Sequence, residues 1–429
     1  MKKIQPTILK GTRDFLPKEM MKRNKVMEIL KSTFEGFGYS PIETPIISPA
    51  ETILGKYGEE GDRLTYSFKD RGDRSIALPY DLTVPFARFF ATNYQDLPLP
   101  FKRYQIQRVW RAEKPQQGRL REFYQCDIDI IGSKSLICEA EIVKMIVTSF
   151  EKLGLKNIVV KTNSRRLMNA VLTSFGVPKE KTMDAIRIID KILKIGEGVA
   201  ISELEKIGIN DPKKIIELLK PEDTNKNTLK KLSAYDTSEL EEFLTYSTLL
   251  GVQEKNIQID PMLARGLDYY TGLTFEVISP DWESGTICGG GRYDNLCGLF
   301  SDKDFSGVGV AFGFERIMLL LEKLNLFQDI KAPSQVLVTI FDKDSVKDAL
   351  STYKILIEAG VPTEIYFESE KLAKQFKFAD KKQIPFVLIR GENERKNDEI
   401  TVKRMENGTQ KTIPLTQLVS YLQNYYEAK

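Results

Sequence analysis

One segment, residues 108–131, constrains the fold and chemistry of this 429-residue chain more than any other. Two extended runs flank a polar loop, which predicts an antiparallel hairpin. The first run and the loop carry four arginines: Arg108, Arg111, Arg119 and Arg121. Alternate residues of a strand share one face, and the second run alternates through Phe123, Gln125, Asp127 and Asp129. The hairpin therefore offers guanidinium groups, an aromatic ring and carboxylates to one surface.

That combination suits a ligand that carries phosphates together with a cationic or hydrogen-bond-donating part. A charged hairpin with one solvated face would show the same pattern, and the hairpin alone does not separate the two interpretations.

Histidine is absent from the chain. Its absence excludes every mechanism that needs an imidazole base, nucleophile or metal ligand. The four cysteines lack Cys-x-x-Cys spacing, so we predict no zinc site and no metal-ligating side chains. Any catalysis must then use carboxylates, arginines, lysines, backbone dipoles or a bound cation.

The composition predicts a cytoplasmic protein. No apolar run approaches the ~18 residues of a membrane helix, and the basic N-terminus lacks the apolar core of a signal peptide. The net charge of +3 neither requires nor excludes a nucleic-acid partner, because a local basic surface is sufficient.

The length predicts roughly three domains. Residues 18–35 show helical periodicity, and the prolines within 37–48 favour an edge strand over a central one. Lysine, glutamate and leucine dominate 167–255, which predicts a helical insertion. Strand and helix alternate over 333–429, which predicts a small, largely parallel α/β domain.

A second motif, Leu-Pro-Tyr-Asp-Leu-Thr at residues 78–83, sets Asp81 and Thr83 two apart, so that both can bind an ammonium group from one side. Either side chain can instead cap the helix predicted from about Thr83. On spacing alone, the helix cap is the better interpretation.

A third motif places Arg265 beside a glycine and two tyrosines, Tyr269 and Tyr270, and is followed by three consecutive glycines at 289–291. The glycines allow a ligand to approach the backbone closely, but a tight turn explains them equally well. An exposed arginine near a tyrosine-rich strand is the simpler interpretation of Arg265.

A fourth motif, residues 307–316, is a glycine-rich strand that leads into a helix bearing Arg316. Its glycines would thin the strand so that a flat group could lie on it. The glycine spacing alone is a weak signal.

In this order and spacing the four motifs resemble the class II aminoacyl-tRNA synthetases, and more closely the histidyl-tRNA synthetase family. Residues 10–17 look like the N-terminal signature of that family, and 37–48 resemble its dimerisation motif. The resemblance implies an α/β protein with three parts. They are an α+β catalytic domain with an antiparallel sheet (1–166 and 256–328), a helical insertion (167–255) and an α/β anticodon-binding domain (333–429).

The implied activity is that of a histidine–tRNA ligase. ATP, with Mg²⁺ on its phosphates, activates L-histidine to histidyl-adenylate, and the acyl group then passes to tRNA(His). The family also implies a homodimer. Both steps move negative charge on oxygen, so preorganised cations matter more than a protein base.

The resemblance also assigns residues. Those expected to contact ATP are Arg111, Glu113, Arg119, Phe123 and Arg316. Those expected to contact histidine are Asp81, Thr83, Gln125, Asp129, Arg265, Tyr269, Tyr270 and Tyr293. Arg111 and Arg265 would be the catalytic pair, on opposite sides of the α-phosphate.

Two departures from the family pattern affect this assignment. Many members carry glutamate where Asp81 and Asp129 stand, and aspartate is one methylene shorter. The motif around Asp81 also lacks an arginine that the family pattern leads us to expect there, and with it one supporting contact.

The main alternative is the non-catalytic regulatory subunit of ATP phosphoribosyltransferase, which resembles the same family. The presence of Arg111, Glu113, Arg265 and Arg316 argues against it. A histidine-free synthetase could also be translated when histidine runs short, although compositional drift in an AT-rich, lysine-rich proteome would have the same outcome.

Overall fold

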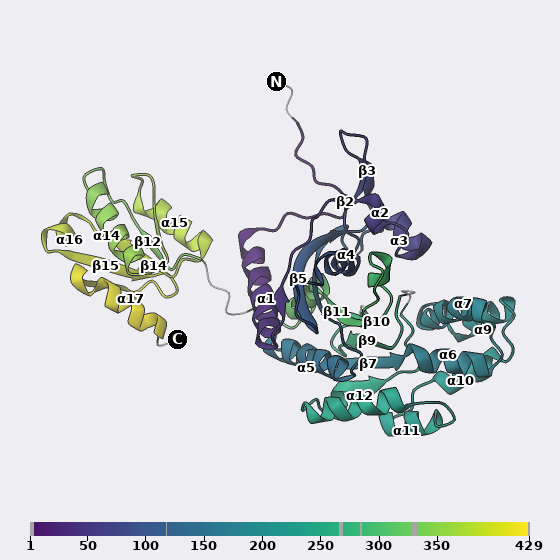
Figure 1. The fold of residues 1–429 in the computed structure, drawn as a ribbon. Coiled ribbons are helices and arrows are strands. Elements are labelled where there is room, and N and C mark those ends of the chain that lie inside the picture. Colours follow the sequence, from purple (N-terminus) through teal and green to yellow (C-terminus); the bar gives the residue numbers. More distant parts are fainter. Residues whose placement is uncertain (1–3, 117, 266–268, 284, 328–332, 428–429) are drawn as a thin grey trace. The chain divides into compact units, whose positions relative to one another are not determined.

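The computed structural model describes residues 4–116, 118–265, 269–283, 285–327 and 333–427 (Figure 1). The chain divides into two compact units, Met1–Phe327 and Gln328–Lys429. Among the residues so described, no helix is both long and apolar enough to cross a membrane.

An eight-stranded sheet organises the first unit, in the order β1-β5-β6-β11-β10-β9-β7-β8. Its strands are β1 (Ser40–Pro41), β5 (Phe101–Trp110), β6 (Glu122–Ile131), β7 (Val159–Ser164), β8 (Ile257–Ile259), β9 (Leu273–Ile278), β10 (Cys288–Tyr293) and β11 (Gly307–Gly313). The pairings are antiparallel except at the two ends, β1–β5 and β7–β8. The predicted hairpin is therefore confirmed as β5–β6, and the proline-bearing β1 lies at the edge, as expected.

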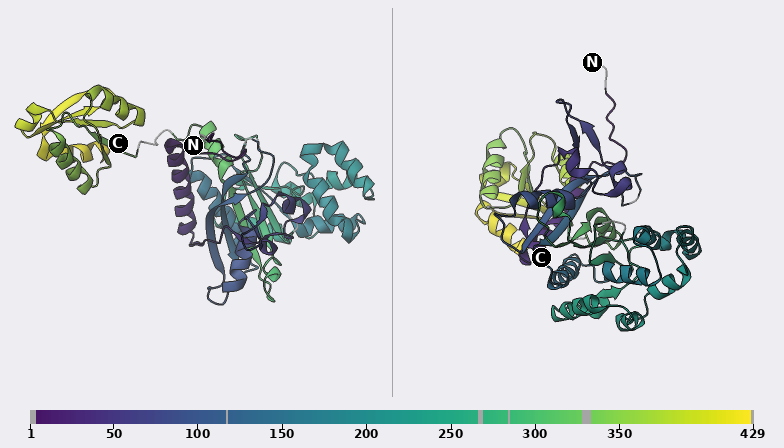
Figure 2. Two further views of the ribbon diagram at one scale, coloured as in Figure 1. Left: turned by 90° about the horizontal axis from the view of Figure 1, so that it is seen from above. Right: turned by 45° about the vertical axis from the view of Figure 1, so that its right-hand side comes forward.

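Three helices cover one face of this sheet: α1 (Pro17–Gly36), α5 (Ile137–Lys152) and α13 (Phe314–Lys323) (Figures 1 and 2). The β6 side chains Cys126, Ile128 and Ile130 are buried in the same core as these helices. Arg23 of α1 and Glu315 of α13 form a buried ion pair, with Nη2 and Oε1 2.6 Å apart.

The helix α4 (Thr83–Asn93) packs in a separate cluster of buried residues, through Phe86 and Phe90. Tyr293 of β10 and Ile131 of β6 belong to that cluster. The polar residues of β6 alternate with its core residues and therefore face away from α1, α5 and α13.

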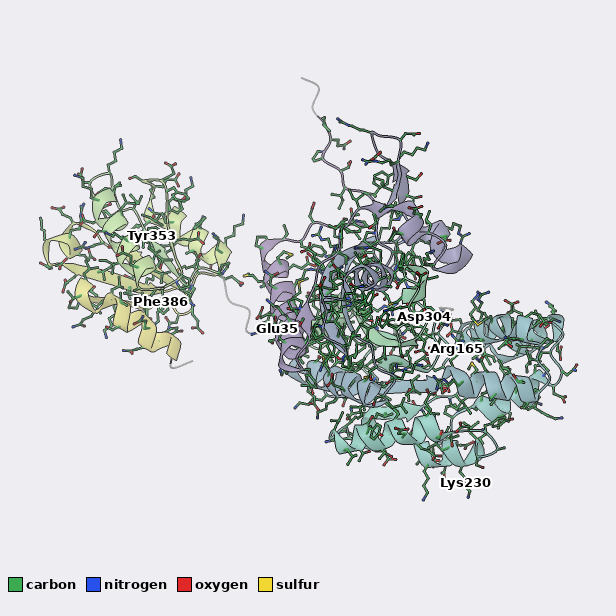
Figure 3. All side chains as sticks on the ribbon, viewed as in Figure 1. Glu35, Arg165, Lys230, Asp304, Tyr353 and Phe386 are labelled. Carbon is green, nitrogen blue, oxygen red and sulfur yellow. The ribbon has the colours of Figure 1, made fainter. Side chains whose placement is uncertain are left out.

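A three-stranded sheet, β2 (Ser48–Pro49), β4 (Ser75–Ala77) and β3 (Ser67–Lys69), adjoins α2 (Ala50–Ile53) and α3 (Gly58–Leu64). The region predicted to be helical contains seven helices: α6 (Arg165–Ser174), α7 (Lys179–Asp190), α8 (Ile192–Ile195), α9 (Glu197–Lys206), α10 (Pro212–Leu219), α11 (Asn225–Lys231) and α12 (Ser238–Leu249). Two 3₁₀ turns, η1 (Glu254–Asn256) and η2 (Cys297–Leu299), complete the first unit. Lysines such as Lys230 lie exposed on these helices (Figure 3).

The second unit is a five-stranded sheet with the order β13-β12-β14-β15-β16. Its strands are β12 (Val336–Val338), β13 (Thr363–Ile365), β14 (Phe386–Ile389), β15 (Glu399–Arg404) and β16 (Gln410–Pro414). Its helices are α14 (Val346–Glu358), α15 (Leu372–Lys382), α16 (Glu392–Lys396), η3 (Leu415–Gln417) and α17 (Leu418–Glu427). In the core, Phe386 packs edge-on against Tyr425, with ring centroids 4.8 Å apart.

The prediction of a largely parallel sheet was wrong for this unit. β12, β13 and β14 pair in parallel, but β14–β15 and β15–β16 are antiparallel. The connections between these last strands carry no long crossover helix, and a short connection returns the chain in the opposite direction.

Candidate active site

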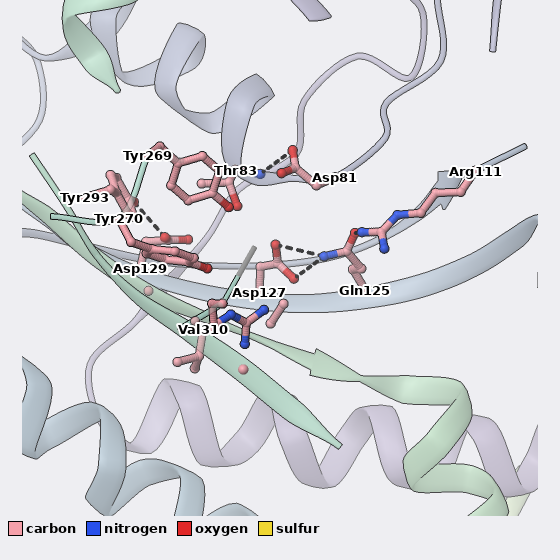
Figure 4. Close-up of a pocket in the computed structure, with 15 residues that line it drawn as sticks. Asp81, Thr83, Arg111, Gln125, Asp127, Asp129, Tyr269, Tyr270, Tyr293 and Val310 are labelled. Atoms are coloured by element: carbon pink, nitrogen blue, oxygen red, sulfur yellow. Dashed lines mark hydrogen bonds between the residues drawn. The ribbon is translucent and has the colours of Figure 1, made fainter. Parts of the chain in front are cut away.

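A cavity with about 470 Å³ of empty space opens over β6, β10 and β11 (Figure 4). All eight residues expected to contact histidine line it: Asp81, Thr83, Gln125, Asp129, Arg265, Tyr269, Tyr270 and Tyr293. Arg111 lines it as well, so the two arginines expected to be catalytic share one cavity. Segments more than 200 residues apart in the chain, from Asp81 to Ala311, therefore meet at one place.

Asp129 is held on both of its oxygens. The Tyr293 hydroxyl donates to Oδ1 at 2.7 Å, and Arg103 Nη2 lies 2.5 Å from Oδ2, an ion pair outside hydrogen-bonding geometry. Arg103 is wholly buried and stacks on the Phe86 ring. Burial raises the pKa of Asp129 to about 6, although Arg103 and Tyr293 lower it.

Sequence reasoning missed Arg103. In the structure the β5–β6 register sets Arg103 directly opposite Asp129, but the hairpin predicted from the sequence began only at residue 108. Directly paired residues on neighbouring strands have adjacent side chains, and a buried carboxylate needs a partner.

The glycines of β10 and β11 make room for these side chains. A Cβ on Gly309 would overlap the Asp129 carboxylate, and one on Gly289 would overlap the Arg265 guanidinium. The expectation that the β11 glycines let a flat ligand group lie on the strand stays a prediction: Asp129 packs directly against Gly309, and Gly309 also lines the cavity.

Asp81 combines the two interpretations that its spacing left open. Its Oδ1 accepts from the backbone N–H groups of Thr83 and Val84, both at 3.1 Å, and so caps the first turn of α4. The same oxygen accepts from the Tyr57 hydroxyl at 2.7 Å. Burial raises the pKa of Asp81 above its ordinary value.

Arg111 is held between two aromatic rings. Its guanidinium lies 4.3 Å from the Tyr80 centroid and 5.2 Å from that of Phe123. Nε donates to the Tyr80 carbonyl at 3.0 Å, and Nη2 donates to Gln125 Oε1 at 3.4 Å. Tyr80 thus supports Arg111 at the motif where we expected an arginine.

Arg265 is partly buried and has a positive φ of 33°. Its Nη1 donates to the Phe275 carbonyl at 3.0 Å, and its own carbonyl accepts from Arg165 at 3.1 Å. Burial by itself lowers the pKa of Arg265, but Tyr270 and Glu276 raise it above the ordinary value. The three residues that follow, 266–268, lie outside the described residues.

Four residues expected to contact ATP do not line the cavity: Glu113, Arg119, Phe123 and Arg316. Glu113 and Arg119 form an ion pair at 3.4 Å. Burial, reinforced by repulsion from Arg119, lowers the pKa of Arg316. Arg316 also donates to the Thr286 carbonyl. Arg119 and Arg111 both lower the pKa of Arg316, so the three cationic side chains lie near one another. Such a group of positive charges favours binding of a polyanion.

The cavity is also lined by residues to which the resemblance assigned no ligand contact: Asp127, Gly289, Gly290, Gly309, Val310 and Ala311. Asp127 was predicted to share the face of Gln125 and Asp129, and it does. Burial raises its pKa to about 8, with Arg103 lowering it and Asp129 and Asp81 raising it further.

No group of three or more aspartate, glutamate or cysteine side chains in the described ranges could hold a metal alone. Mg²⁺ needs no such cage, since it retains waters and binds through one or two carboxylates plus substrate phosphates. Glu113 and Glu276 lie close enough to Arg316 to oppose the lowering of its pKa, and their carboxylates fit a phosphate-borne Mg²⁺.

Comparison with known proteins agrees with this geometry. The family described as histidyl-tRNA synthetase matches residues 11–317, and the anticodon binding domain matches residues 335–425. The histidine–tRNA ligase of Christiangramia forsetii is 39% identical, with 95% of this chain and 97% of that protein covered. The histidine–tRNA ligase of Clostridium tetani is 36% identical, with 98% and 99% covered.

Solved structures match equally broadly. Histidyl-tRNA synthetase from Nostoc sp. PCC 7120 superposes with a TM-score of 0.87 at 31% identity, covering 99% of this chain and all of that one. A Bacillus halodurans protein, described as an ATP phosphoribosyltransferase regulatory subunit/histidyl-tRNA synthetase, shares the fold, with a TM-score of 0.73 at 20% identity over 89% of this chain and 98% of that one. The match of the family over most of the chain, with relatives this similar over nearly its full length, means that the chain belongs to the histidyl-tRNA synthetase family.

Proposed function

We propose that this protein is a histidine–tRNA ligase that activates L-histidine with ATP in the cavity over β6 and then transfers it to tRNA(His). The observation that carries the proposal is the meeting in one cavity of Arg111 and the eight expected histidine contacts, Arg265 among them. Full-length relatives named as histidine–tRNA ligases support the same activity.

In the first step the histidine carboxylate attacks the α-phosphate of ATP, and pyrophosphate leaves. Arg111 binds the carboxylate and the α-phosphate together, a positioning task for which a planar guanidinium is suited. Arg265 stabilises the charge that develops on the phosphate from the opposite side. Neither role needs a proton acceptor, which agrees with a chain that contains no histidine.

Histidine is selected by its ring. Asp129 and Tyr270 recognise the imidazole edge, and Tyr293 lines that end of the cavity and fixes Asp129. Asp81, Thr83, Gln125 and Tyr269 complete the binding set around the amino group. A site that hydrogen-bonds both ring nitrogens rejects analogues without them by roughly 10⁴-fold.

ATP lies toward the cationic group beside the cavity. Arg119 and Arg316 contact its phosphates, Glu113 contacts the adenine or a magnesium-linked group, and Phe123 stacks on the adenine. Mg²⁺ supplies charge neutralisation on the β- and γ-phosphates when it is bound.

The second unit recognises the anticodon of tRNA(His), and residues 167–255 form an insertion domain within the catalytic part. The enzyme acts as a homodimer in the cytoplasm. The regulatory subunit of ATP phosphoribosyltransferase is not favoured as an alternative, because the relatives that match over the full chain are ligases and the C-terminal unit matches an anticodon-binding domain.

One assay tests the proposal directly. Purified protein is incubated with ATP, radiolabelled pyrophosphate and each amino acid in turn, and label entering ATP is measured. We expect exchange with histidine only, and histidine transfer when tRNA(His) is added. Histidine binding without exchange would contradict the ligase and favour the regulatory alternative.

A further inference from the structure

Three buried carboxylates, Asp81, Asp127 and Asp129, face one cavity (Figure 4). Two of them already have strong partners. Asp129 is paired with Arg103 and accepts from Tyr293. Asp81 accepts from the Tyr57 hydroxyl and from two backbone N–H groups.

Asp127 differs from the other two. It is 2% exposed, and its hydrogen-bond donor is the neutral amide of Gln125, at 3.2 Å from Oδ1 and 3.4 Å from Oδ2. Among the described residues no cation lies within ion-pair distance of it. A buried carboxylate in this situation needs either a proton or a cationic partner.

The nearby cations are engaged elsewhere. Arg103 pairs with Asp129, and Arg265 Nη1 donates to the Phe275 carbonyl. Arg111 donates to the Tyr80 carbonyl and to the Oε1 oxygen of Gln125, the residue whose Nε2 donates to Asp127. Among the described side chains no cation is therefore left to pair with Asp127, so a proton or a cation from outside the protein must neutralise it.

We infer that Asp127 is the counter-ion of the substrate's α-ammonium group, and that it loses its own proton when histidine binds. The inference rests on the proposed function, which puts histidine in this cavity with its ammonium near Gln125. No covalent bond forms: the acid O–H bond of Asp127 breaks, the proton passes to a base in solution, and a carboxylate–ammonium pair replaces the neutral acid.

The charges around Asp127 support this exchange. Asp129 and Asp81 face Asp127 and disfavour a third negative charge, whereas Arg103 favours the ionised form of Asp127. The thiols of Cys126 and Cys288 also lie near Asp127. With its pKa raised to about 8 by burial, Asp127 is mostly neutral at pH 7.5. An ammonium group within hydrogen-bonding distance shifts the balance toward the carboxylate.

Calorimetry of histidine binding at pH 7.5 tests the coupling. Titrations are run in phosphate and in Tris, whose ionisation enthalpies differ. The slope of the apparent binding enthalpy against the buffer ionisation enthalpy gives the number of protons released. We expect release of most of one proton per histidine, because an acid with a pKa of about 8 is mostly protonated at this pH. The analogue 3-(imidazol-4-yl)propionate lacks the ammonium, and we expect its binding to release almost none.

The substrate's own ring is the alternative proton source, and the sequence provides a control. Because the chain contains no histidine, untagged protein has no imidazole signal, so nitrogen NMR of labelled histidine reports the bound ring alone. At pH 7.5 the ring is mostly neutral before binding, and we expect it to stay so.

Asp127→Asn keeps the side-chain shape but cannot ionise. We expect it to abolish proton release and to weaken histidine binding roughly 10- to 100-fold, the usual range for losing a hydrogen bond to a charged group. Asp302→Asn, which removes an exposed carboxylate of the same unit, is the matched control and should leave both quantities unchanged.

Histidine binding by the parent protein without proton release would overturn the inference and leave the ligase proposal intact. So would undiminished affinity and proton release in Asp127→Asn. No histidine binding to the parent protein at all would instead overturn the proposed function, and this inference with it. Asp127→Glu, which retains the acid, guards against a misfolded asparagine variant and should still release a proton.

Discussion

The guanidinium of Arg265 occupies the space that a side chain at Gly289 would need. The loop before β9 carries the arginine, β10 carries the glycine, and the absence of a Cβ lets the guanidinium lie against the sheet. The position of the Arg265 guanidinium, which we expect to stabilise the transition state, therefore depends on Gly289, a residue without a side chain.

Gly289→Ala should displace Arg265 and lower the rate of adenylate formation. Misplacing a group that acts on the transition state costs on the order of 10²-fold in rate. Histidine-dependent ATP–pyrophosphate exchange measures the loss. Gly198→Ala is the matched control, since nothing lies within 4 Å of the added Cβ, and it should leave the exchange rate unchanged. Equal exchange rates for Gly289→Ala and the parent would contradict the dependence of the Arg265 position on Gly289.

Arg265→Ala should reduce adenylate formation by several orders of magnitude with only a modest change in histidine affinity. The reason is that its charge acts mainly on the phosphate of the transition state, whereas ground-state contacts of histidine come from the other lining residues. Single-turnover kinetics and equilibrium histidine binding separate the two effects. Near-normal pyrophosphate exchange would refute this role.

Asp129→Ala should abolish histidine activation while ATP binding survives. Asp129 lies at the tyrosine end of the cavity, fixed by Tyr293 and Arg103, whereas Arg119 and Arg316, the arginines expected to hold the outer ATP phosphates, do not line the cavity. Calorimetry measures the affinity of the variant for a non-hydrolysable ATP analogue and, in a separate titration, for histidine. We expect only the histidine affinity to fall. If both affinities fall equally, Asp129 is not the imidazole contact.

Asp127→Asn should change the pH dependence of stability. The folded-state pKa of about 8 lies above the ordinary value of ~3.9, so the folded protein binds this proton more tightly than the unfolded chain does. The stability that Asp127 contributes is present below pH ~4 and is lost as the pH rises toward about 8. The variant should therefore gain most in Tm, relative to the parent, at pH 9. Thermal unfolding at pH 5 and pH 9 measures the difference, and an equal shift at both values would exclude this linkage.

The absence of histidine predicts that synthesis of this protein resists histidine shortage. In a translation extract depleted of histidine, the chain should reach full length, and a variant with histidine at one exposed position, Asn157→His, should stall there. The histidine content of other proteins from the same organism decides whether the absence is selected. An equally low content elsewhere would mean compositional drift.

Local patterns were sufficient for much of the secondary structure. The hairpin, the helix over 18–35 and the helical stretch after residue 166 follow from periodicity and from glycine and proline positions, which act over a few neighbouring residues. The strands of the second unit were also located, but their mixed direction was not, because direction depends on how distant segments pair. The short helices α2, α3 and α16 were missed because each is too short to repeat an apolar pattern.

The resemblance to the synthetase family predicted a cavity-lining residue only where that residue has a known place in a family motif. Arg103 and Asp127 lie in or beside those motifs without a motif role, and their importance comes from contacts across strands. Asp81 shows another limit of sequence-based prediction. Its spacing from Thr83 fits both a helix cap and a cavity contact, so the sequence alone does not separate the two.

By itself the sequence determined the chemistry that was possible: carboxylates, arginines and tyrosines without any imidazole, on strands and helices with recognisable periods. Only the tertiary structure decided which carboxylates have partners. Charge balance in a buried cavity is set by groups a few ångströms apart in space and far apart in the chain, so Asp129 and Asp127, two residues apart on one strand, differ because Arg103 reaches one and not the other.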